Sequence, residues 1–174
     1  MSNITKHFSM MPIYFYGTRT KTYGYFSNFS LHGFELDGFW WATNEHYFQA
    51  QKFATTDRPW FDKIREVKTP KEAARMGRSR KHPLRPDWEK VKDEIMEGGV
   101  LKKFETHGGI RVILLSTGDR LIVENSPTDY YWGCGKDGTG KNKLGLILMA
   151  VRETWRNANS NGLESADTSR LKQE

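Results

Sequence analysis

The sequence contains very little cysteine, with a single residue, Cys134, in 174. One thiol excludes a disulfide within the chain and a zinc site built from several thiolates. Long apolar segments are missing as well. None approaches the roughly 20 residues of a membrane span, and residues 1–11 hold no apolar core of signal-peptide length. We therefore expect a protein without membrane association in a reducing compartment, cytoplasmic or, in a eukaryote, nuclear.

Linker-like and repeated segments are also missing between residues 12 and 156. A chain of 174 residues is about one domain, long enough to bury roughly two thirds of its unfolded surface. Residues 1–11 and 157–174 are polar and unpatterned, so we expect flexible tails on either side of one compact domain at 12–156.

Positive charge and aromatic residues are plentiful. Lys and Arg number 27 against 21 Asp and Glu, a formal net charge of +6, and aromatics make up 13% of the chain with six Trp. The charge favours anionic partners such as phosphates, nucleotides or nucleic acid, although a solvated surface with a modest lysine excess fits it equally well. The aromatics either fill a core or line a site for a flat ligand.

Short apolar segments predict an α+β fold that is mainly helical with short strands and hairpins. Asp37-Gly38 is a turn signal within 34–41 and predicts a hairpin there. Thr69 to Glu72 is a capping box that starts a helix ending at Gly77. Because strands and helices do not alternate regularly, a doubly wound sheet is disfavoured. The other expected elements are a strand at 13–16, a helix from Thr43 or Asn44 to about Ala54, a helix from Asp87 to Gly108-Gly109, a second hairpin formed by 111–116 and 120–124, and a last helix that ends near Trp155.

The expected helix at 43–53 carries an unusual pair of charges. Positions 45, 48, 49 and 52 share one face, and the helix is apolar enough to require burial. Glu45 and Lys52 then form a buried ion pair, or face a pocket as a carboxylate and an amine, or only stabilise the helix N-terminus and reach to water. His46 has no second ligand at metal-binding spacing, so we expect a hydrogen-bonded core histidine and no metal or cofactor.

Two loops have compositions typical of anion binding. Residues 77–85 hold four cations and a histidine, and arginine binds phosphate well. The alternative is a plain basic loop between two helices, and because such clusters are common the signal is weak on its own. Residues 124–145 combine acidic side chains, three aromatics and five glycines before a helix. Glycines let backbone N–H groups approach a phosphate, and a helix N-terminus favours negative charge. The spacing matches neither a Walker loop nor a dinucleotide-binding fingerprint, so the prediction of a ligand loop depends on composition alone.

Several motifs taken together resemble the NADAR (YbiA-like) family. They are TNEHYFQAQKF at 43–53, D-x-x-W-G-x-G from Asp129 and G-x-N-x-L-G from Gly140, and the resemblance covers about residues 12–155. It implies an N-glycosidase that hydrolyses the bond between a ribose C1 and an amino nitrogen. Two substrate classes are associated with the family: ADP-ribose on the guanine amino group of nucleic acid, with a possible DarT-type ADP-ribosyltransferase as partner, and phosphoribosylaminopyrimidine intermediates of riboflavin biosynthesis. The alternative is a non-catalytic module that binds ADP-ribose or nucleotides.

With that resemblance, residue chemistry suggests roles for individual side chains. Lys52 attacks C1 to form a Schiff base while Glu45 shuttles protons, or Glu45 activates water as an acid/base and Lys52 only binds substrate. Asp129 stabilises positive charge at C1 in either scheme. The residues expected to contact substrate are Tyr16, Phe26, Trp88 and Trp132 by stacking, Asn28 and Asn142 at ribose hydroxyls, Arg78, Arg80 and Arg85 at phosphates, and Gly133 in the glycine-rich loop.

Overall fold

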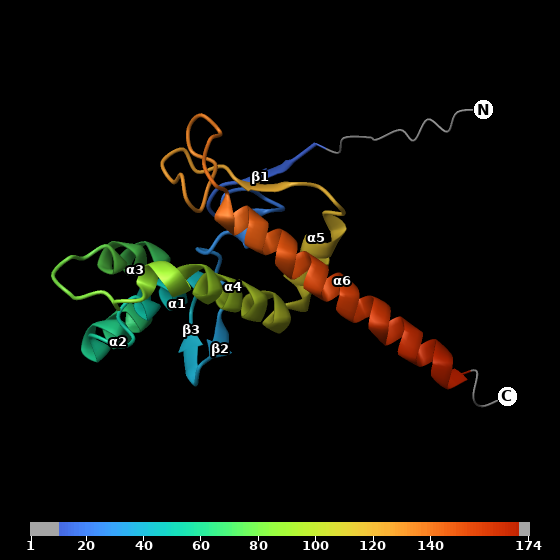
Figure 1. Ribbon diagram of the computed structural model, residues 1–174, viewed down its shortest axis with the longest axis horizontal. Coiled ribbons are helices and arrows are strands. Elements are labelled where there is room, and N and C mark those ends of the chain that lie inside the picture. Colours follow the sequence, from blue (N-terminus) through green and yellow to red (C-terminus); the bar gives the residue numbers. More distant parts are fainter. Residues whose placement is uncertain (1–10, 171–174) are drawn as a thin grey trace.

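The computed structural model describes the backbone of residues 11–170 and the side chains of residues 11–158. Within that part the fold is α+β and mainly helical, as the sequence predicts (Figure 1). In chain order its elements are β1 (Ile13–Phe15), the 3-10 helix η1 (Gly24–Phe26), β2 (Phe34–Leu36), β3 (Phe39–Trp41), α1 (Asn44–Gln51), α2 (Arg58–Glu66), α3 (Pro70–Gly77), α4 (Trp88–Thr106), α5 (Gly108–Ser116), β4 (Ile122–Glu124) and α6 (Lys143–Arg170).

The local signals for turns and caps are confirmed. Strands β2 and β3 pair antiparallel across Asp37 and Gly38, whose φ angles of 55° and 79° are those of a type I′ turn. Thr69 forms a capping box at the start of α3, and the Thr43 hydroxyl accepts the N–H of His46 at the start of α1. Each of these features depends on residues at most three positions apart, and this is why the sequence alone identifies them.

The predicted second hairpin is wrong. Residues 108–116 form helix α5, and β4 pairs in parallel with β1 at the other end of the chain. The apolar run at 111–115 is too short for its periodicity to separate strand from helix. Contacts with α4 and α6 decide the question: they bury Ile110 and Leu114, four residues apart, and leave Val112 exposed. The two-stranded pairing of β1 with β4 therefore joins residues more than 100 positions apart.

Two helices differ from the sequence prediction in extent or existence. Helix α2 was not predicted, although Asp57 caps it by accepting the N–H of Trp60, and Pro59 stands in its first turn. Helix α6 continues past Trp155 to Arg170, and no proline interrupts that stretch. Its second half extends away from the other elements (Figure 1). The flexible tails were predicted at 1–11 and 157–174; the second prediction is wrong for 157–170, which continue α6, and residues 1–10 and 171–174 lie outside the described residues.

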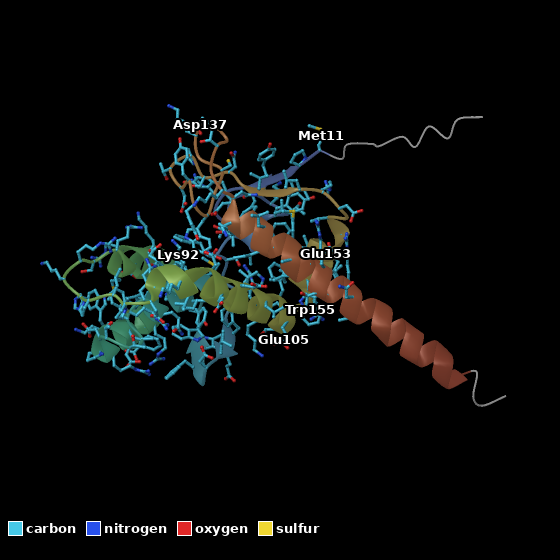
Figure 2. All side chains as sticks on the ribbon, viewed as in Figure 1. Met11, Lys92, Glu105, Asp137, Glu153 and Trp155 are labelled. Atoms are coloured by element: carbon cyan, nitrogen blue, oxygen red, sulfur yellow. The ribbon has the colours of Figure 1, made fainter. Side chains whose placement is uncertain are left out.

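Helix α1 lies between two hydrophobic clusters and is buried along its whole length. Phe48 faces the cluster formed by β1, β4, α4, α5 and α6. Tyr47, Ala50 and Phe53 face the second cluster, which α2, α3 and the β2–β3 hairpin complete. Trp155 of α6 lies on the outer side of the first cluster (Figure 2). The guanidinium of Arg111 packs over its ring at 4.3 Å. Because α1 has no solvent face, its polar side chains must point into a cavity or find partners within the fold.

Lys103 of α4 is a fully buried amine. Its Nζ donates a hydrogen bond to the carbonyl of Ser27 at 3.0 Å, and burial lowers its pKa from 10.5 to about 7. Between these two values the unfolded chain holds a proton that the folded chain has released. Stability should therefore rise with pH from 7 to 10, because the unfolded state binds more protons there.

Replacing Lys103 with Met should flatten this rise. The wild type is expected to gain on the order of a few kcal/mol between pH 7 and pH 10 from this group, and the Met variant should lack that gain. The Ser27 carbonyl would keep only the hydrogen bond from the Ser30 N–H, and the lost bond adds a cost to the variant that is the same at every pH. Urea unfolding of both proteins at unit steps from pH 6 to pH 10 measures the difference. Parallel stability curves would contradict the assignment.

Candidate active site

A cavity of about 430 Å³ opens between α1, α3 and the loop 125–142. Its wall also includes the ends of β1, η1 and β4, so elements from the whole chain meet there. Of the residues that the sequence suggested, seven line it: Tyr16, Asn28, Glu45, Lys52, Arg78, Asp129 and Trp132. Further lining residues are Ser27, Phe29, Phe48, Gln49, Ala74, Met96, Glu124, Ser126 and Thr128.

The predicted polar face of α1 forms one side of this cavity. Glu45, Gln49 and Lys52 all line it. Glu45 accepts a hydrogen bond from the Gln49 amide at 2.8 Å, and the Lys52 amine donates to the carbonyl of Gly77 at 3.3 Å. Each charged group therefore has a neutral partner. Among the three interpretations of this face, the arrangement agrees with a carboxylate and an amine that face a pocket.

Burial shifts both groups toward their neutral forms. It raises the pKa of Glu45, against the opposing effects of Gln49 and Lys52. It lowers the pKa of Lys52 to about 8. The attraction of Glu45 raises that value and the repulsion of Arg80 and Arg78 lowers it further. Desolvation thus outweighs the nearby carboxylate, and a useful fraction of Lys52 is a neutral amine near pH 7 to 8.

Two more carboxylates line the cavity from the opposite side. One oxygen of Asp129 accepts the backbone N–H groups of Tyr131 and Trp132 at 2.8 and 2.7 Å, which fixes the start of the loop. Glu124 ends β4, and within the described chain its carboxyl group makes no hydrogen bond or ion pair. Burial, with the negative charges of Asp129 and Glu45, raises the pKa of Glu124 to about 7.

Glu124 was not among the site residues suggested from the sequence. A signal was present, since it ends a predicted strand directly before the Asp129 motif, and strand ends often carry functional side chains. Its position depends on Asn142, whose side chain accepts the N–H of Glu124 at 2.9 Å and donates to the carbonyl of Ile122 at 2.8 Å. Asn142 therefore anchors the end of β4 and does not line the cavity.

The glycine-rich loop is not an open phosphate cradle. The backbone N–H groups of seven of its residues donate to carbonyls of Glu124 or of the loop itself: Cys134, Gly135, Gly140, Lys141, Asn142, Lys143 and Leu144. The last two belong to the first turn of α6, so that helix N-terminus is also occupied. Position 133 requires glycine because the backbone packs closely there: a Cβ would lie 2.9 Å from the carbonyl oxygen of Glu124. The expectation that this loop binds anions through its backbone is therefore corrected.

Two of the suggested aromatic residues lie in the core. Phe26 has no exposed surface and packs edge-on against Phe15 with ring centroids 5.7 Å apart. Trp88 is buried against Phe48. Neither lines the cavity, because their rings pack in the hydrophobic cluster beneath it. Trp132 does reach the cavity and stands edge-on to Phe48 at 5.2 Å.

The basic loop contributes one arginine directly. Arg78 lines the cavity, whereas Arg80 is exposed beside it and acts on the pKa of Lys52 through its charge. Arg85 lies away from the cavity and holds Asp87 through two hydrogen bonds of 2.6 and 2.9 Å. Only one of the three suggested phosphate ligands is thus placed in the wall.

His46 is a core histidine. Its Nδ1 lies 2.7 Å from the Thr43 hydroxyl, and its Nε2 lies 3.1 Å from the carbonyl of Val67. Among the side chains that the structure describes, those of residues 11–158, no group of three His, Cys, Asp or Glu is placed to hold a metal ion. Within the described backbone no helix is both long and apolar enough to cross a membrane.

A family model described as the NADAR domain matches residues 14–156, nearly all of the folded part. The chain belongs to the NADAR family. Among NADAR relatives, an N-glycosidase of Nostoc punctiforme is 53% identical over 84% of this chain and 94% of its own length. The N-glycosidase YbiA of Escherichia coli is 48% identical over 81% of this chain and 86% of its own.

Two further comparisons extend this picture of the NADAR domain. The solution structure of E. coli YbiA has a TM-score of 0.77 at 43% identity, covering 86% of this chain and 89% of that one. A maize protein named riboflavin biosynthesis protein PYRR is 41% identical over 75% of this chain, which matches only 23% of that longer protein.

Proposed function

We propose that this protein is an N-glycosidase that cleaves the bond between a ribose C1 and an exocyclic amino nitrogen, and that its substrate is guanine carrying ADP-ribose in nucleic acid. The observation that carries the reaction is one cavity in which an amine of lowered pKa meets three carboxyl groups, those of Glu45, Glu124 and Asp129. The names of the NADAR relatives support the reaction class.

The chemistry begins with the lone pair of the amino nitrogen on C1. Protonation of the ring oxygen opens the ribose and leaves an iminium between C1 and that nitrogen. The neutral amine of Lys52 adds to C1, the bond from C1 to the base nitrogen breaks, and the base leaves with a proton. A Schiff base joins Lys52 to C1 until water hydrolyses it and releases the free sugar. In the competing route water itself attacks C1, and Lys52 only binds substrate.

The three carboxyl groups divide the proton transfers and the electrostatics. Glu45 shares the α1 face with Lys52 and exchanges protons with the ring oxygen and the attacking group. Glu124 is unpaired and about half protonated near pH 7, so it serves as the acid for the departing nitrogen. Asp129, held by two backbone N–H groups, supplies negative charge for the cationic C1.

This division of roles predicts a narrow pH profile. Neutral Lys52 requires a pH near or above 8, and protonated Glu124 requires a pH near or below 7, so kcat/KM should peak between these values. Glu124→Gln is expected to lower the peak by about 10²-fold and to remove the decline on the alkaline side. The profile is measured from pH 5.5 to 9.5. An alkaline decline that persists unchanged in the variant would rule out Glu124 as the acid.

A phosphoribosylaminopyrimidine of riboflavin biosynthesis is the second candidate substrate. The riboflavin names among the relatives favour it. The net charge of +6 and Arg78 in the cavity wall favour the nucleic acid. Both substrates present the same ribose linked through an amine, so the same catalytic groups would serve either one. If the substrate is ADP-ribosylated nucleic acid, a DarT-type ADP-ribosyltransferase would be the partner that creates it.

The deciding experiment offers the purified protein both substrates in parallel and scores the released base by mass spectrometry. Release from a guanine-ADP-ribosylated oligonucleotide, with kcat/KM well above that for the pyrimidine, is the expected result. Release from the pyrimidine alone would mean that the substrate is a small metabolite rather than modified nucleic acid. Tight binding of ADP-ribose without release from either substrate would make the protein a reader of the modification.

A further inference from the structure

A side chamber of about 300 Å³ adjoins the catalytic cavity. The two spaces share Tyr16, Ser27, Phe29 and Glu124, so they meet at one common wall. Beyond that wall the chamber adds only Gly17, Thr18 and Arg19. Its volume is at the lower end of the range of about 300 to 1,000 Å³ found for ligand pockets. No role proposed above uses it.

The loop that forms the chamber is held in place by close packing. Tyr16 follows directly after β1, and Gly17, with a φ of +55°, changes the direction of the chain at the next residue. Gly24 then packs directly on the loop, because a Cβ there would lie 2.6 Å from the carbonyl oxygen of Thr18. The N–H of Gly24 also donates to the carbonyl of Thr20 at 2.7 Å. Arg19 is therefore presented to the chamber by a backbone that is fixed on both sides.

The free donors of the chamber match a phosphate. Within the described chain Arg19 makes no hydrogen bond or ion pair, so its guanidinium is available for two parallel bonds to phosphate oxygens. Thr18 adds a hydroxyl, and Tyr16 adds a half-exposed ring on which a base can stack. The glycine-rich loop is a weaker competitor, because seven of its backbone N–H groups already donate to the carbonyls of Glu124 or of the loop itself. We therefore assign phosphate recognition in the chamber to the side chains of Thr18 and Arg19.

A second cation lies at a different end of the combined space. Arg78 lines the catalytic cavity but not the side chamber, and Arg19 lines the side chamber but not the cavity. The carboxyl groups and Lys52 lie in the cavity with Arg78, and Glu124 stands in the shared wall. A substrate with a phosphate on only one side of its ribose would use only one of these arginines. Two separate arginines fit a substrate that has phosphate groups on both sides of the reacting ribose.

We propose that the side chamber binds the diphosphate of a nucleoside diphosphate linked to the reacting ribose, with Arg19 as its phosphate ligand, while Arg78 meets the phosphate backbone on the base side. This assignment rests on the proposed function, because it takes the reacting ribose to lie beside Lys52. It narrows the substrate to an extended dinucleotide-like molecule and makes the side chamber a determinant of specificity.

Titration calorimetry with ADP-ribose and with deoxyguanosine monophosphate, which represents only the base side, tests the chamber without needing turnover. Arg19→Gln is expected to weaken ADP-ribose binding by about 10-fold or more and to change deoxyguanosine monophosphate binding by less than about 2-fold. Lys21→Gln removes an exposed cation of the same loop that lines neither space, and it should leave both affinities unchanged. An unchanged ADP-ribose affinity in Arg19→Gln, or an equal loss for both ligands, overturns the proposal, as does a wild type that does not bind ADP-ribose.

A parallel assay of turnover separates this proposal from the proposed function. If the wild type releases guanine from the modified oligonucleotide and Arg19→Gln does not change ADP-ribose binding, the proposed reaction stands and the proposed role of the side chamber is wrong. If Arg19→Gln selectively weakens ADP-ribose binding but the wild type releases no base, the proposed role of the side chamber stands and the proposed reaction is wrong.

Discussion

Replacing Glu45 with Gln is expected to lower kcat/KM by about 10²- to 10⁴-fold, the usual contribution of a positioned acid/base. The substitution should leave the fold intact, because the glutamine oxygen can still accept the hydrogen bond that Gln49 donates to Glu45 at 2.8 Å. It also removes a negative charge that holds the pKa of Lys52 up. The acidic limb and the optimum of the pH profile should therefore move to lower pH than in the wild type.

Glu89→Gln provides a matched control for that experiment. Glu89 also raises the pKa of Lys52 through its charge, but it is exposed and does not line the cavity. The control should show at most a small shift of the acidic limb and nearly wild-type kcat/KM. If Glu45→Gln also stayed within 10-fold of the wild type, Glu45 would have no acid/base role in the reaction.

Replacing Lys52 separates the two proposed routes. If its amine forms the Schiff base, Lys52→Met and Lys52→Arg should both lose about 10³-fold or more in kcat, on the order of 4 kcal/mol in the barrier. Arginine keeps the charge but has no neutral amine to attack C1. If Lys52 only binds substrate, the Arg variant should retain much of the activity and lose it mainly through KM.

Chemical trapping gives a readout of the Schiff base that does not depend on rate. Borohydride added during turnover should reduce the imine and leave the sugar on Lys52, detectable by peptide mass spectrometry. Glu45→Gln should slow the appearance of this adduct, and the Lys52 variants should not form it. Full activity in Lys52→Arg together with no adduct in the wild type would leave water as the attacking group.

The sequence predicts those parts of the fold and site that depend on near neighbours. The helical spacing of Glu45 and Lys52 places both on one face of α1. Turn and cap chemistry predicts the β2–β3 hairpin and the start of α3, since each depends on a few adjacent residues. The motifs around these elements also suffice to suggest the NADAR family, which the comparisons confirm.

Tertiary structure alone decides what lies opposite α1. The parallel pairing of β1 with β4 brings Glu124 to the cavity, and no local pattern specifies a partner more than 100 residues away. Desolvation, which depends on every neighbouring atom, gives Lys52 its lowered pKa despite the nearby carboxylate. Phe26 likewise lies in the hydrophobic core. Hydrogen bonds to backbone carbonyls occupy seven N–H groups of the glycine-rich loop that could otherwise donate to phosphate. Spacing along a helix is local and can be read from the chain, whereas burial and long-range pairing exist only once the chain has folded.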